Sequence, residues 1–245
     1  MKILLLLLAS CLTGLILADE EPLNANRPNF TTNALLLAKG EIILEFGTTF
    51  QHDHNTDGLS GPEAVLRLGR SGGTELDFTL PNFSFGGRGI DFSGFGDSSF
   101  YLSKQLSWLS GWDTAAGIGT SLPLGQADLT SNSFDTQAYF SASRQITKNS
   151  SITMSDFAQW KRIGTDIIPA YSIAMMLSQN TSKNSSIFVE WLGTWTKDQP
   201  TTHTMHLGKT FAHNHRQQAD FHLGRTFEGG AGGNWFFGAG YAVRL

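Results

Sequence analysis

The last residues of the chain, 234–245, read NWFFGAGYAVRL and show its clearest pattern. Every second residue is apolar, and these are Trp235, Phe237, Ala239, Tyr241, Val243 and Leu245. Successive side chains of a β-strand point to opposite faces, so one face of this segment is wholly apolar. Aromatic alternation that runs to a hydrophobic C-terminal residue is typical of the closing strand of a transmembrane β-barrel, with one face toward lipid and the other toward a lumen.

The other end of the chain has the pattern of a secretory signal peptide. An apolar run from Ile3 to Leu17 follows Lys2 and ends at Ala18. We expect cleavage after Ala18, with lipoprotein processing at Cys11 as the alternative. The predicted organisation is a signal peptide at 1–18, a polar N-terminal segment at 19–39 and a barrel domain at 40–245.

Alternation of apolar and polar residues recurs along 40–245 and predicts an all-β fold. In the first predicted strand, for example, Leu44 faces outward and Glu45 inward. The number of such segments predicts a single antiparallel transmembrane β-barrel of about twelve strands. Long connections near 82–96, 123–133 and 163–168 alternate with short turns, as expected of an outer-membrane barrel.

The segment 151–162 departs from this regularity. Ile152 and Met154 begin one phase, and Phe157 falls on the opposite face. An extra residue in one strand changes the phase in this way, so we expect a β-bulge within the segment.

Aromatic residues gather at the predicted strand ends in two groups. One group is Trp160, Tyr171, Trp195, Phe227 and Trp235, and the other is Trp108, Trp112 and Phe211. Amphipathic rings prefer the two membrane interfaces, so these groups are predicted to form the two aromatic girdles of the barrel.

Composition and motifs exclude several function classes. The net charge of -4 does not fit a nucleic-acid binder. After the signal peptide no apolar run is long enough for a transmembrane helix. No Gly-x-Ser-x-Gly sequence or phosphate-binding loop is present, so we expect neither an enzyme nor a bound cofactor.

Several short motifs resemble, in their order, a known family. They are Arg27-Pro28-Asn29-Phe30-Thr31, Lys39-Gly40, Leu44-Glu45-Phe46-Gly47, Gly94-Phe95-Gly96-Asp97, Leu122-Pro123-Leu124-Gly125 and Trp235-Phe236-Phe237-Gly238-Ala239-Gly240. The chain resembles bacterial outer-membrane transporter-like proteins labelled with the meta-pathway of phenol degradation. The resemblance covers most of the mature chain and implies a channel for small compounds, aromatic or hydrophobic ones among them. Leu245 stands where the family has a terminal Phe, which departs from the signal read by the barrel-assembly machinery.

Strand parity also assigns residues to the lumen. The inward acids are Glu41, Glu45, Glu63, Glu75, Asp77, Asp113, Asp135, Glu190 and Asp220, against the bases Arg67, Lys161 and Arg244. The principal candidates for lining the lumen or binding a ligand are Glu45, Arg67, Asp113, Glu190, His206, Asp220 and His222. An open acidic lumen would favour cations or neutral solutes, whereas mutual pairing of these charges would fill a closed barrel.

His206, Asp220 and His222 form a subset of these candidates. His206 and His222 begin near-repeats on adjacent predicted strands, and Asp220 lies two residues before His222. A tight turn at 212–215 would set His206 opposite either His222 or Asp220. Two imidazoles and a carboxylate are weak candidates for a metal site, and a hydrogen-bonded structural cluster is the alternative.

The sequence leaves three readings of function open. The first is an outer-membrane channel, in contact with outer-membrane lipid, a small-molecule solute and the barrel-assembly machinery. The second is a soluble secreted or periplasmic β-barrel that binds a ligand. The third is a closed barrel that acts as a structural anchor or adhesin.

Overall fold

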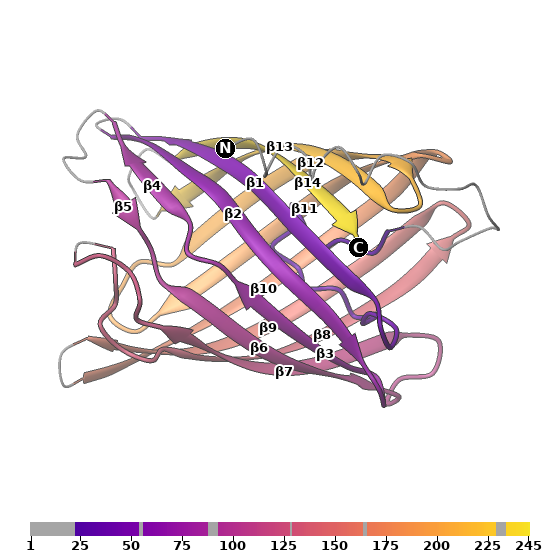
Figure 1. The fold of residues 1–245 in the computed structure, drawn as a ribbon, viewed down its shortest axis with the longest axis horizontal. Helices are drawn as coiled ribbons and strands as arrows, with labels where there is room; N and C mark the ends of the chain where they lie inside the picture. The colour runs from indigo at the N-terminus through magenta and orange to yellow at the C-terminus, as the bar shows by residue number, and fades with distance from the viewer. Residues whose placement is uncertain (1–22, 54–55, 88–92, 128, 164–165, 229–233) are drawn as a thin grey trace.

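The computed structural model describes residues 23–53, 56–87, 93–127, 129–163, 166–228 and 234–245 as a closed antiparallel β-barrel (Figure 1). Each wall strand pairs with its sequence neighbours, and β1 pairs with both β2 and β14, which closes the ring. The twelve wall strands are β1 (Ile42–His52), β2 (Asp57–Arg70), β3 (Thr74–Thr79), β6 (Ser98–Leu106), β7 (Asp113–Leu122), β8 (Thr136–Thr147), β9 (Ser150–Ile163), β10 (Asp166–Ser182), β11 (Ser185–Thr196), β12 (Thr202–Asn214), β13 (Gln217–Glu228) and β14 (Trp235–Arg244). The predicted all-β barrel is therefore confirmed.

Two short strands interrupt the predicted long connection at 82–96. β4 (Phe83–Gly86) pairs with the first residues of β2, and β5 (Gly94–Phe95) pairs with β4. They lie at the end of the barrel that carries the longer connections, which we call the loop end. The opposite end, where short connections such as 71–73 and 148–149 join the strands, we call the turn end.

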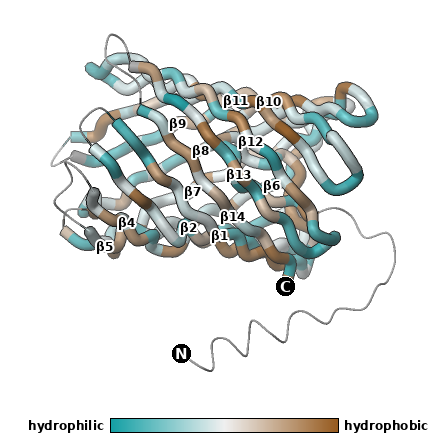
Figure 2. Tube along the Cα trace, turned by 90° about the horizontal axis from the view of Figure 1, so that it is seen from above, coloured by the Kyte–Doolittle hydropathy of each residue, from teal (hydrophilic) through white to brown (hydrophobic). Residues whose placement is uncertain are grey.

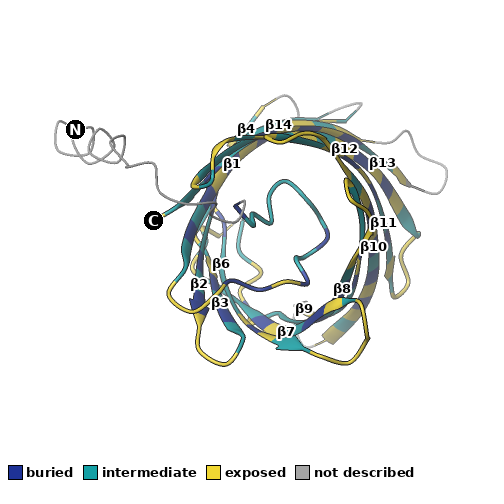
Figure 3. Ribbon diagram, turned by 90° about the vertical axis from the view of Figure 1, so that its right-hand side faces the viewer, coloured by how far each residue is buried: buried dark blue, intermediate teal, exposed yellow. Residues whose placement is uncertain are grey.

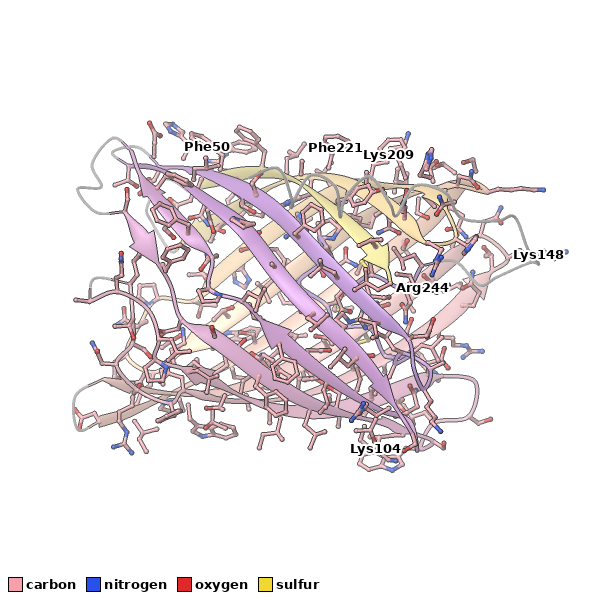
Figure 4. The ribbon with its side chains drawn as sticks, in the orientation of Figure 1. Phe50, Lys104, Lys148, Lys209, Phe221 and Arg244 are labelled. Atoms are coloured by element: carbon pink, nitrogen blue, oxygen red, sulfur yellow. The ribbon has the colours of Figure 1, made fainter. Side chains whose placement is uncertain are left out.

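Every wall strand carries at least one exposed large apolar side chain. Hydrophobic and hydrophilic residues are interspersed along the strands (Figure 2). Direct cross-strand pairs connect Val189 to Leu207, Leu207 to Leu223 and Leu223 to Phe237, and all four side chains are exposed. Phe50 and Phe221 likewise point away from the barrel, as does Lys209 (Figure 4). The closed ladder pairs the backbone N–H and C=O groups, and the apolar exterior suits a lipid environment.

The expected bulge in β9 is wrong. β9 pairs with β10 without a register shift from Ser150 to Ile163, and its shift against β8 lies at the turn, between Gln145 and Thr147. Phe157 is instead a regular inward residue that packs with Tyr139 and Ala174. Its apolar side chain looked out of phase because the lumen contains an apolar contact.

The chain entering β1 lies inside the barrel. Residues 23–39, which we call the inner segment, run within the ring of strands (Figure 3). Leu23 and Leu37 pack with Ile43 and Ala242 of the wall, and Phe30 packs against the cluster around Phe157. The barrel therefore encloses a peptide as well as its own inward side chains.

Among the described residues no helix is both long and apolar enough to cross a membrane. The predicted signal peptide, 1–18, lies outside the described residues, so cleavage after Ala18 and processing at Cys11 stay predictions.

Candidate functional site: the lumen and its inner segment

Glutamates of the wall bind the backbone of the inner segment. Glu45 accepts the amides of Asn26 and Arg27 at 2.9 Å each. Glu190 accepts the amides of Phe30 at 2.9 Å and Thr31 at 2.6 Å. A carboxylate that accepts backbone N–H groups makes charge-assisted bonds, which are stronger than neutral ones. Two predicted lumen residues thus act as clamps on a peptide.

Further along the inner segment, other wall residues continue this pattern. Glu75 accepts the amide of Leu37 at 2.6 Å. Gln105 accepts the amide of Leu36 and donates to the carbonyl of Ala34, both at 2.8 Å. Glu75 and Gln105 lie on the paired strands β3 and β6, whereas Glu190 lies on β11, so the segment is held across the lumen rather than along one wall.

Hydroxyl groups fix the middle of the inner segment. Ser155 accepts the amide of Thr32 at 3.0 Å, and Ser141 donates to the Thr32 carbonyl at 2.5 Å. Both serines are buried on adjacent strands. Thr32 is therefore anchored through both of its backbone polar groups.

Arg67 is the centre of a buried charge network. Its Nε and Nη2 donate to Glu75 at 2.9 and 2.7 Å, and its Nη1 donates to Glu45 at 3.0 Å. Nη1 also donates to the carbonyl of Asn24 at 2.5 Å. Arg67 thus holds the two glutamates in the positions from which they bind the inner segment. The predicted inward facing of Glu45 and Arg67 is present in the structure.

Arg27 of the inner segment lies flat against the wall over two glycines. A Cβ at Gly47 or Gly240 would collide with its guanidinium group. Arg27 donates to Glu63 at 3.0 Å, and its Nε lies 3.7 Å from Oδ2 of the buried Asp220. The glycines on β1 and β14 are therefore the seat of a cation that the segment itself supplies.

The histidine register differs from the prediction. His206 lies directly opposite Gly224, because β12 continues to Asn214 and the ladder shifts between Ala212 and Asn214. His206 Nδ1 lies 2.8 Å from Glu190, and its Nε2 lies 3.1 Å from Nδ1 of His222. The predicted facing of His206 with His222 or Asp220 is thus wrong, although the two imidazoles still meet diagonally.

Asp220 lies beside Arg27, and its oxygens make no hydrogen bond to either histidine within the described part of the chain. Within the described part of the chain, no group of three or more His, Cys, Asp or Glu residues is arranged to hold a metal ion. The Glu190–His206–His222 series is a hydrogen-bonded chain across the neighbouring strands β11, β12 and β13, and it begins at a clamp on the inner segment.

Two cavities lie on opposite sides of the inner segment. The vestibule, a cavity of about 690 Å³, is bounded by residues 26–30 and by inward side chains of the loop-end half, including Tyr101 and His222. The second cavity, of about 730 Å³, is bounded by residues 35–39 and by the turn-end residues 105–110. Asp113 lines this second cavity and is exposed there, far along the lumen from the other candidates.

Arg27 and the inner segment were missed as lumen elements by the strand analysis. Alternation assigns faces only within strands, and 23–39 has no strand pattern. Arg27 stood only in one of the motifs that carry the family resemblance. The only available signal was the excess of inward acids, which indicates that the lumen also holds N–H donors or cations.

Comparison with known proteins identifies the class of fold. No family model matches the chain, and no curated protein matches its sequence. An outer membrane channel from Pseudomonas putida F1 has a TM-score of 0.70 at 14% identity, over 91% of this chain and 100% of that one. The KdgM porin in complex with disordered oligogalacturonate has a TM-score of 0.59 at 10% identity, over 83% and 99%.

The CymD monoaromatic hydrocarbon channel has a TM-score of 0.51 at 9% identity, over 85% of this chain and 89% of that one. At these identities the similarities show the fold alone. The chain therefore has the fold of outer-membrane β-barrels, and the resemblance to the phenol meta-pathway family stays a prediction.

Proposed function

We propose that this protein is an outer-membrane channel for small compounds. The observation that carries the proposal is the vestibule, a cavity of about 690 Å³ inside a barrel that exposes large apolar side chains on its strands. Its lining combines aromatic rings with amide and hydroxyl groups, which suits small solutes that have both polar and apolar parts.

The inner segment lies between the vestibule and the second cavity, so a solute that crosses the barrel must pass it. The segment is held by hydrogen bonds and ion pairs rather than by covalent links, and such contacts can exchange between two arrangements. In the proposed channel, the segment shifts within the lumen when solute passes.

The resemblance of the motifs to the phenol-pathway family supports a solute of aromatic or hydrophobic character. The side chains of Tyr101 and Phe157 in the vestibule provide apolar contact for such a compound. The proposal also includes secretion by the predicted signal peptide, contact with outer-membrane lipid and insertion by the barrel-assembly machinery.

An engineered disulfide tests whether the inner segment controls passage. Thr32 and Ser155 are adjacent, and residues 19–245 contain no cysteine, so Thr32→Cys with Ser155→Cys gives a single possible internal pair. Swelling of proteoliposomes in a neutral pentose measures flux. We expect flux in the reduced protein and its loss on oxidation, with the single variant Thr32→Cys insensitive to oxidant.

A sealed barrel that acts as an anchor is the second candidate, and the many contacts of the inner segment favour it. It predicts no flux in either redox state and no single-channel current in a planar bilayer. That outcome would overturn the channel proposal while leaving the fold untouched.

A further inference from the structure

Asp77 is a buried acid with no cation within hydrogen-bond distance among the described residues. It lines the vestibule and is only 9% exposed. Arg67 is its nearest cation, with Nε 3.9 Å from Asp77 Oδ1, beyond hydrogen-bond distance. All three nitrogens of Arg67 already donate to Glu45, Glu75 or the carbonyl of Asn24.

Arg67 is shared by three acids. Glu45, Glu75 and Asp77 surround one arginine. The two glutamates also accept amides of the inner segment, whereas Oδ1 of Asp77 is buried without a hydrogen-bond partner among the described residues. A buried carboxylate in this state is stabilised by a cation with N–H donors.

Two tyrosines fix an aromatic wall beside this carboxylate. Tyr101 lies directly opposite Asp77 in the pairing of β3 with β6, and its ring rests on Gly119, where a Cβ would collide with it. Its hydroxyl donates to Gln137 at 2.9 Å. Tyr139 rests on Gly117 in the same way and donates to Ser103 at 2.6 Å. The rings are therefore held against the wall on the same side of the vestibule as Asp77.

A carboxylate beside aromatic rings is a suitable environment for an organic ammonium ion. The carboxylate accepts the N–H donors, and the rings contact the apolar body and attract the positive charge. Neither an anion nor a purely apolar molecule uses both features. The vestibule, at about 690 Å³, has room for a ligand of the size of a substituted benzene.

We propose that the vestibule binds small organic cations, with a protonated amine at Asp77 and an apolar or aromatic body beside Tyr101 and Tyr139. The inference rests on the proposed channel function for its purpose, since it names the class of solute that the channel would select. Binding itself is measured without flux.

Isothermal titration of the full barrel, refolded in detergent at neutral pH, tests the selectivity with three ligands of one skeleton. They are phenethylamine, which is cationic, 2-phenylethanol, which is neutral, and phenylacetate, which is anionic. We expect phenethylamine to bind about tenfold or more tightly than 2-phenylethanol, and phenylacetate to bind weakest. Equal affinities, or preference for the neutral or anionic ligand, would overturn the inference.

Matched variants test the assigned residues. Asp77→Asn should remove the preference for the amine, whereas Asp113→Asn makes the same charge change in the second cavity and should preserve it. Tyr101→Leu should weaken phenethylamine binding, and Tyr101→Phe, which keeps the ring, should not. Migration of boiled and unboiled samples on a gel verifies that each variant is folded. An Asp77→Asn protein that binds the amine as the parent does would exclude this site.

The ligand-binding and flux experiments can refute the cation site and the channel independently of each other. A barrel that passes solutes without distinguishing the three ligands would retain the channel and lose the cation site. A barrel that binds phenethylamine through Asp77 without flux in any state would retain the site and lose the channel.

Discussion

Replacing Glu190 by Gln should release the inner segment from one of its two-amide clamps. Oε2 of Glu190 accepts from Phe30 and lies 2.8 Å from His206 Nδ1, while Oε1 accepts from Thr31. A glutamine oxygen placed at the Oε2 position keeps the hydrogen bonds with the Phe30 amide and His206. Its NH₂ group then faces the Thr31 amide, donor against donor.

The magnitude follows from these contacts. Loss of one charge-assisted bond costs about 2 kcal/mol, and conversion of the other from charged to neutral costs about 1 kcal/mol. The sum of about 3 kcal/mol corresponds to an increase of about 100-fold in the population of the detached segment. Glu190 is fully buried, so solvent does not compensate for the lost acceptor.

Hydrogen–deuterium exchange with mass spectrometry measures this effect. Peptides that cover 26–37 should exchange about 100-fold faster in Glu190→Gln than in the parent, while strand peptides such as those from β10 keep their protection. Asp113→Asn, at the turn end, serves as the charge-matched control. Unchanged protection of 26–37 in Glu190→Gln would refute the clamp.

Three further predictions concern other parts of the barrel. Gly240→Ala introduces a Cβ into the seat of Arg27, so hydrogen–deuterium exchange around Arg27 should rise several-fold. Boiled and unboiled samples should still migrate differently on a gel. Unchanged exchange would contradict the assignment of Gly240 to this seat. Leu207→Arg places a cation in the apolar exterior and should lower the free energy of unfolding in bilayers by about 2 to 4 kcal/mol, whereas Leu207→Phe should change it little; similar effects of both would argue against a lipid-facing Leu207. Although partial burial acts in the opposite direction, hydrogen bonds from the amides of Ser131 and Gly125 lower the pKa of Asp97 below its ordinary value. A lowered pKa in the folded state stabilises the loop above the ordinary carboxyl pKa of about 3.9, and this contribution is lost as pH falls through the lowered value. Asp97→Asn should therefore loosen residues 123–133 at neutral pH, and its exchange difference from the parent should shrink below about pH 4; a difference independent of pH would contradict this.

The wall of the barrel could be predicted from sequence because facing within a strand depends on a local period of two. Leu44 and Glu45 alternate as expected, and the closing strand pairs with β1. The same local rule misled at Phe157, because an apolar side chain was assumed to seek lipid. Phe157 packs instead in the lumen, where Phe30 supplies an apolar neighbour.

The contents of the lumen could not be predicted from strand alternation. The contact between Thr31 and Glu190 joins residues 159 positions apart, and no local pattern encodes such a distance. Parity correctly placed acids inside, but it could not show that their partners are backbone amides. The register at His206 failed for a different reason, since one irregularity near Asn214 moves every later pair.

The clamps on the inner segment recognise main-chain N–H groups, which nearly every amino acid provides. Side chains at Asn26, Phe30, Thr31 and Leu37 can therefore change in evolution without loss of these particular bonds, with proline as the exception because it has no N–H. Arg27 is under an additional constraint, since its side chain occupies the seat formed by Gly47 and Gly240. Relatives with the same occupied lumen would then share few identical residues in this region beyond that arginine and the two glycines. An alignment scored by residue identity would therefore understate how much of the architecture they have in common.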